Sequence, residues 1–165
     1  MRTFAIPFLM PLFLAPIASF AADPAPPKPV PYETYGGYFV SNKFEPDRPA
    51  SFVVLRDQQA FDAVFGAGFV MHDKSHRLAR NAFDSRIVIA AIQRGKAMWD
   101  FKVQDVSASD GSVALRYTST STPQPSATYS CPLILSIPKA DYTAVQFIEN
   151  GKVVQTVPLK STPQK

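Results

Sequence analysis

The sequence is poor in cysteine and histidine. It contains one cysteine, Cys131, and two histidines. A lone cysteine excludes an intramolecular disulfide. Because Cys131 precedes a proline and an apolar run, we expect its thiol to be buried where a strand begins. The net charge of +4 is too small to indicate a nucleic-acid partner.

Motifs of three enzyme classes are also absent from the sequence. There is no G-x-S-x-G elbow, and no histidine lies near Cys131 along the chain. The segment Gly66-Ala67-Gly68 is too short for a phosphate-binding loop, and Lys74 is not placed as the lysine of such a loop would be. The few glutamates adjoin turn-forming or proline-containing sequence, which does not indicate a catalytic carboxylate pair. We therefore predict a protein without catalytic activity and without a cofactor.

The N-terminal residues indicate export from the cell. Arg2 precedes an apolar stretch over residues 4–20, and the small residues Ser19 and Ala21 suit cleavage before Ala22. Prolines interrupt this stretch, and it is shorter than the roughly 20 apolar residues of a membrane-spanning helix. We therefore predict a signal peptide over residues 1–21, a periplasmic or secreted mature protein, and no membrane span after cleavage.

The mature chain is expected to hold one domain. Prolines alternate with small residues over residues 22–34, and this composition predicts an extended tether. A single β-rich domain is expected over residues 35–158, and a disordered tail over residues 159–165.

Strand patterns dominate the predicted domain. Residues 86–93 are apolar almost without interruption, which predicts a central strand buried on both faces. Alternating apolar residues predict half-buried strands over residues 99–103 and 113–117, joined by a turn at Asp110-Gly111. Asn150-Gly151 predicts a second hairpin near the C-terminus.

One short helix is expected to pack on these strands. Asp57 is a plausible N-cap, and Phe61, Val64 and Phe65 recur on one face, while Gly66 and Gly68 are expected to end the helix. We predict an α+β, β-rich fold with a mostly antiparallel sheet or sandwich of six to seven strands. The helix phenylalanines are expected to share a single core with strand residues, namely Val88, Trp99, Phe101, Leu115, Leu135 and Phe147.

The segment His72-Asp73-Lys74-Ser75-His76 is the most distinctive cluster in the sequence. On a helix the two imidazoles would lie one turn apart, as in the zinc-binding H-E-x-x-H motif. The glutamate of that motif is absent, and nearby cations oppose a divalent metal. Two interpretations stay open: a metal-dependent hydrolytic enzyme using His72 and His76, or a basic segment without a metal.

A basic segment could instead contact a partner. Between residues 71 and 102 the chain carries seven Lys or Arg residues and three Asp residues. This excess could attract an acidic protein surface or an anionic polymer of the envelope, although charge clusters are also common on solvated faces. We predict a protein partner that contacts the basic segment over residues 72–86 and an uncharged loop over residues 118–130. The candidate partner-binding residues are His72, Lys74, His76, Arg77 and Arg80.

Three stretches of the sequence resemble a known family. They are residues 51–65, residues 82–91, and residues 131–139 with the following Val145-Gln146-Phe147. Their order and composition resemble the C-terminal domain family of bacterial protease-complex regulatory (PrcB-type) proteins. This resemblance implies an extracytoplasmic, non-catalytic domain that associates with a protease or stabilises it. Here Arg94-Gly95-Lys96 stands where that family has a Gly-Gly-Tyr turn.

Overall fold

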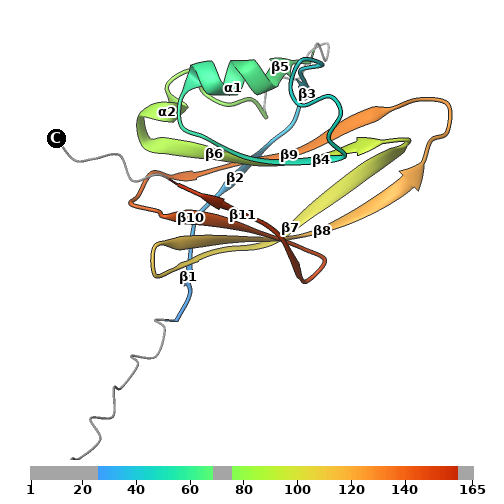
Figure 1. Ribbon diagram of the computed structural model, residues 1–165. Helices are drawn as coiled ribbons and strands as arrows, with labels where there is room; N and C mark the ends of the chain where they lie inside the picture. Colours follow the sequence, from blue (N-terminus) through green and yellow to red (C-terminus); the bar gives the residue numbers. More distant parts are fainter. Residues whose placement is uncertain (1–25, 69–75, 160–165) are drawn as a thin grey trace, which may run out of the picture.

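The computed structural model describes residues 26–68 and 76–159. In these residues two β-sheets pack face to face, and two short helices lie over the outer side of one sheet (Figure 1). The paired strands are antiparallel apart from β8 and β10, which are parallel. The predicted β-rich, mostly antiparallel α+β fold is confirmed.

The larger sheet has five strands in the order β1, β7, β8, β10 and β11. Its strands are β1 (Lys28–Pro29), β7 (Ala97–Ser109), β8 (Ser112–Pro123), β10 (Ala144–Glu149) and β11 (Lys152–Pro158). Strands β7 and β8 form its long central hairpin, so the rest of this sheet is built around them.

The smaller sheet has four strands in the order β2, β9, β6 and β4. These strands are β2 (Glu33–Tyr35), β9 (Tyr129–Pro138), β6 (Arg86–Gly95) and β4 (Ala50–Leu55). Two further strands, β3 (Tyr38–Val40) and β5 (Phe65–Ala67), pair with each other. They lie over this sheet with α1 (Gln58–Val64) and α2 (Ala82–Ser85).

The number of longer strands agrees with the sequence prediction. Of the eleven strands in the described ranges, seven have six residues or more, and the other four, β1, β2, β3 and β5, have two or three. Strands this short contain too few alternating residues to be recognised from their pattern. The four-residue helix α2 was not predicted, for the same reason.

Strand β6 is buried on both faces, as predicted, and it separates two cores. Its odd-numbered residues, Ile87 to Ala91, face a first core between the two sheets. Its even-numbered residues, Val88 to Ile92, face a second core beneath α1.

The prediction of one shared core is therefore wrong. Phe61 of α1 and Phe65 of β5 belong to the second core with Val88, whereas the strand residues Leu115, Leu135 and Phe147 belong to the first. Trp99 is only half-buried and is part of neither core.

Helix α1 begins as predicted but ends differently. The Asp57 side chain accepts a hydrogen bond from the backbone N–H of Ala60 over 2.8 Å, which caps the first turn. The helix ends because Phe65 is extended and starts β5. Gly66 then lies opposite Phe39, and a Cβ at this position would be 2.2 Å from the phenyl ring. The absence of a side chain at Gly66 therefore allows the Phe39 ring of β3 to pack closely against β5.

Both predicted hairpins are confirmed by backbone geometry. Asp110 and Gly111 have φ values of 49° and 74°, and Asn150 and Gly151 have 49° and 79°. A two-residue type I′ turn requires positive φ angles at both central residues, and its geometry matches the right-handed twist of the paired strands.

The uncharged segment over residues 118–130 is mostly strand, so the prediction of a loop over these residues is wrong, while its role in partner binding stays a prediction. Strand β8 continues to Pro123, and Met98, Asp100 and Lys102 of β7 pair with Thr122, Thr120 and Thr118. β-Branched threonines favour strand pairing. Only residues 124–128 connect β8 to β9.

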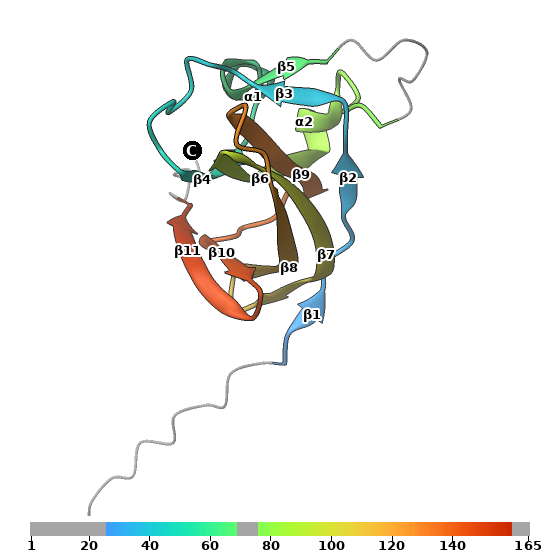
Figure 2. The same cartoon turned by 90° about the vertical axis from the view of Figure 1, so that its right-hand side faces the viewer.

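The proline-rich N-terminal residues contact both sheets. Strand β1 pairs with β7 in the five-stranded sheet, and β2 pairs with β9 in the four-stranded sheet. Between them Val30 is buried in the first core, and its N–H donates to the carbonyl of Val106 over 2.8 Å. Residues 28–35, which we call the N-terminal arm, therefore cover one side of the sandwich (Figure 2). The prediction of a tether over residues 22–34 is wrong for residues 28–34, because they pair with or pack against the two sheets.

Candidate functional site

The predicted basic segment is described only in part. His72 and Lys74 lie outside the described residues. Arg77 is half-buried, and its Nη2 donates to the backbone carbonyl of Gly68. The carbonyl of His76 accepts from the N–H of Gly36 over 3.2 Å, so this part of the chain is held against the turn before β3. Arg80 is exposed. Arg77 thus has a structural contact, which the sequence did not indicate.

Metal chemistry gains no support from the described part of the chain. Within residues 26–68 and 76–159, no three His, Cys, Asp or Glu side chains are grouped so that they could hold a metal ion. In the same ranges, no helix has the length and apolar character needed to cross a membrane.

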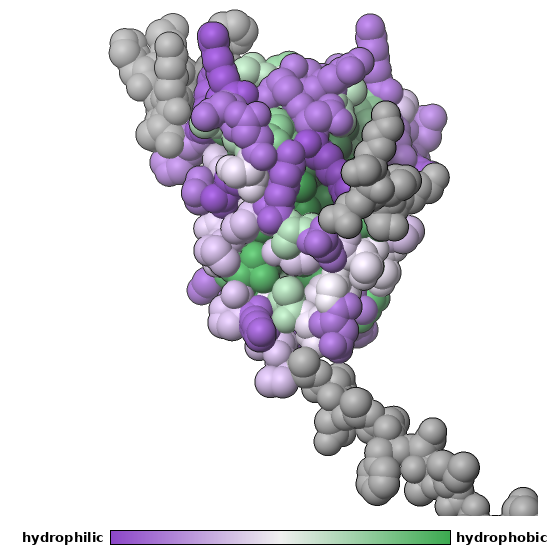
Figure 3. Space-filling model, turned by 90° about the vertical axis from the view of Figure 1, so that its left-hand side faces the viewer, coloured by the Kyte–Doolittle hydropathy of each residue, from purple (hydrophilic) through white to green (hydrophobic). Residues whose placement is uncertain are grey.

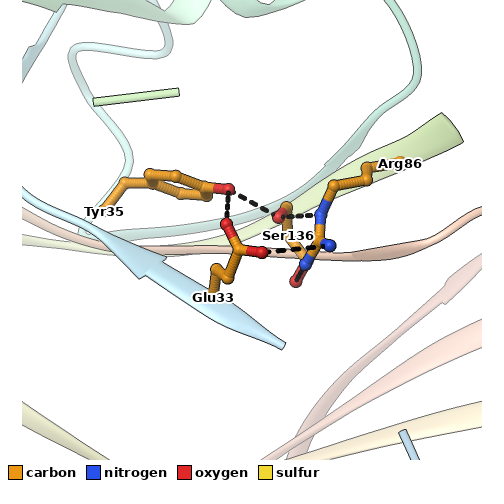
Figure 4. A network of polar contacts seen from close by, with 4 residues as sticks. All are labelled: Glu33, Tyr35, Arg86 and Ser136. Atoms are coloured by element: carbon orange, nitrogen blue, oxygen red, sulfur yellow. Dashed lines mark hydrogen bonds and ion pairs between the residues drawn. The ribbon is translucent and has the colours of Figure 1, made fainter. Parts of the chain in front are cut away.

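A polar network joins the N-terminal arm to the four-stranded sheet (Figure 4). The Tyr35 hydroxyl lies 3.0 Å from Oε2 of Glu33 and 2.8 Å from Oγ of Ser136. Arg86 donates through Nε to the same Oγ over 2.6 Å and through Nη2 to the Ser136 carbonyl over 3.1 Å. Its Nη1 lies 3.2 Å from Oε1 of Glu33.

This network has the properties of a structural contact. Ser136 is 0% exposed, so its hydroxyl cannot be reached from solvent. Burial raises the pKa of Tyr35, and its hydroxyl therefore stays protonated as a donor. The four side chains satisfy one another, and the result is attachment of β2 to β9. Sequence patterns did not identify this network because Tyr35 and Ser136 are 101 positions apart.

The side of the sandwich opposite the N-terminal arm is bordered by two edge strands. Strand β11 is the last strand of the five-stranded sheet, and β4 is the last strand of the four-stranded sheet. The two strands lie on the same side of the molecule (Figure 2). Among the described residues, no further strand pairs with either of them. We call this side, formed by β4 and β11, the open edge.

Apolar side chains of the open edge are incompletely covered. Phe52 and Val54 of β4 and Val157 of β11 pack against the first core but remain partly exposed. On β11 itself, Val153 is 57% exposed and Val154 is 40% exposed. Exposed aliphatic side chains on an edge strand are unusual, because edge strands commonly carry charged side chains that prevent pairing with other chains.

A cleft lies where the open edge ends. It has a volume of about 350 Å³ and is lined by Arg56, Ile87, Lys139, Ala140 and Asp141. Hydrophobic residues are visible among hydrophilic ones on this end of the molecule (Figure 3).

The two cations of this cleft differ in their contacts. The Nζ of Lys139 donates to the carbonyl of Phe83. The half-buried side chain of Arg56 makes no hydrogen bond or ion pair with the rest of the described chain. Arg56 therefore keeps its full capacity to bind an anionic group.

Comparisons with known proteins do not identify this chain. No protein-family model, curated protein or solved structure matches it. The resemblance to PrcB-type domains therefore stays a prediction.

Proposed function

We propose that this chain is an exported, non-catalytic binding domain that associates with a protein of the cell envelope. An extracytoplasmic protease is the partner class that the sequence resemblance implies. The observation that carries the proposal is the open edge, where Val153 and Val154 are exposed on the edge strand β11. Exposed apolar surface next to free backbone groups is typical of protein-interaction sites.

The basic segment is a second contact within the same proposal. Exposed Arg80, together with Lys74, would act on the encounter with an acidic surface. Its contribution is long-range attraction, whereas the open edge supplies the short-range contacts.

Site-specific crosslinking tests the proposal. A photoreactive amino acid replaces Val153 in the full-length exported protein, and the matched control replaces exposed Asp62 on α1. We expect illumination of the native envelope fraction to yield a discrete crosslinked protein from position 153 and none from position 62. Equal crosslinking from both positions, or none from position 153, would contradict the proposal.

A further inference from the structure

We propose that the open edge accepts one extended segment of the partner, which adds as a strand beside β11 and directs an acidic group to Arg56. This inference rests on the proposed function and specifies the chemistry of the partner at the same surface.

The N-terminal arm is an internal example of this mode. On the opposite side of the sandwich, one extended segment pairs with β7 of the first sheet and β9 of the second. It also places one apolar side chain, Val30, in the first core. The open edge has the same construction, with one border strand from each sheet and the first core between them. A second extended segment would therefore find the same type of site.

Strand β11 offers the backbone groups that such a segment needs. It pairs with β10 along one side, and no strand within residues 26–68 and 76–159 pairs with its other side, where the N–H and C=O groups of an edge strand lie. Side chains that alternate along an added strand would contact Val153 on one face and Val157 with Phe52 on the other. Main-chain hydrogen bonds would supply affinity, and these apolar contacts would favour β-branched residues.

The cleft determines the charge of the segment. Strand β4 ends at Leu55, directly before Arg56, and the N–H of Leu159, which follows β11, donates to the carbonyl of Thr143. Arg56 itself lines the cleft, and Thr143, which accepts from Leu159, follows the lining residue Asp141 by two positions. Arg56 and Lys139 outnumber the one carboxylate of Asp141, so the cleft favours an anionic group.

The same argument favours a foreign segment over a second copy of this chain. Strand β11 contains Lys152 and no acidic residue, so pairing of two copies through β11 would not supply an anionic group from that strand. We therefore infer an extended, β-branched segment with a carboxylate at one end.

A synthetic peptide tests this mode of binding directly. The probe alternates threonine and valine over the length of β11, ends in aspartate, and carries a fluorophore. Two further versions are N-methylated at alternate residues, one at the odd and one at the even positions. Since only one set of N–H groups can face β11, we expect one methylated version to bind at least about tenfold more weakly than the other.

Two substitutions in the full-length mature protein complete the test. Arg56→Gln should weaken binding of the aspartate peptide about tenfold and abolish its advantage over an asparagine-ended peptide. Val153→Lys should weaken both peptides, whereas Met98→Lys, at another exposed apolar residue of the same sheet, should not. Thermal unfolding of each variant shows whether the fold is retained.

Equal binding of the two methylated peptides, or no binding of the parent peptide at millimolar concentration, would overturn the inference. Crosslinking from position 153 together with either result would leave the proposed function in place and remove only strand addition. Peptide binding without any crosslinked envelope protein would support strand addition and contradict the proposed function.

Discussion

The side-chain amide of Gln93 donates to Oε2 of Glu149 over 3.2 Å, and this hydrogen bond joins the two sheets. Gln93 lies on β6 and Glu149 on β10, so each sheet contributes one partner. The same carboxylate accepts from the hydroxyls of Tyr117 and Ser119. One acidic group therefore connects three strands at the end of the first core.

The hydrogen bond from Tyr117 to Glu149 predicts that the protein loses stability at alkaline pH. Burial raises the pKa of Tyr117, and the charge of Glu149 and its hydrogen bond raise it further. Below about pH 10, the ordinary tyrosine pKa, both the folded and unfolded states hold the proton, so the stabilising contribution is fully present. Above that pH the unfolded state loses its proton first, and stability falls. We expect Tyr117→Phe to show a shallower decline in urea-unfolding free energy above pH 10. An unchanged slope would contradict this assignment, with exposed Tyr32→Phe as the control.

Replacing Phe61 by alanine should destabilise the protein by about 3–5 kcal/mol, because a large buried ring leaves a cavity. Phe61 is 2% exposed and its ring contacts those of Tyr38, Phe65 and Phe83. The control is Phe39→Ala, at a ring that is 55% exposed, for which we expect a loss of about 1 kcal/mol. Chemical denaturation measures both values. Similar losses for the two variants would mean that α1 contributes little to the second core.

Arg86 should matter more to stability than its ion pair with Glu33 suggests. Arg86→Ala leaves the fully buried Ser136 without two charged donors and should cost about 2 kcal/mol. Glu33→Gln removes an ion pair whose acidic side chain is 62% exposed, keeps an amide that can hydrogen-bond to Tyr35, and should cost below about 1 kcal/mol. Proteolysis near residue 30 should accelerate in the arginine variant only. The reverse order of effects would show that the ion pair holds the arm.

Charge reversal in the basic segment should separate two roles. Arg80→Glu together with Lys74→Glu should leave the unfolding free energy unchanged and slow association with an acidic partner, most strongly at low salt. Arg77→Glu should also destabilise the fold, because it removes the donor to the Gly68 carbonyl. Surface plasmon resonance with the crosslinked partner measures the rates. Unchanged association by the double variant would remove the basic segment from the interface.

Export predicts a mature N-terminus at Ala22. Intact-mass measurement of the protein from the envelope fraction should show loss of residues 1–21, because small residues flank this bond. Recovery of a species that retains Met1 would contradict a cleaved signal.

Local features of this fold were determined by the sequence itself. Asp110-Gly111 and Asn150-Gly151 form the predicted turns because their φ preferences are set by the residues themselves. Burial of β6 on both faces follows equally from its uninterrupted apolar run. Asp57 caps α1 through an atom three residues away, which is also a local effect.

The order of strands in the two sheets determined the division into two cores, the position of the N-terminal arm and the open edge. The sequence could not reveal that Phe61 and Phe147 lie in different cores, because apolar periodicity shows that a face is buried and not against which sheet. Nor could it show that Val30 anchors the N-terminal arm, since the partner strands β7 and β9 lie far along the chain. The open edge arises only because β11 and β4 come last in their sheets, an outcome of long-range pairing that no local pattern encodes.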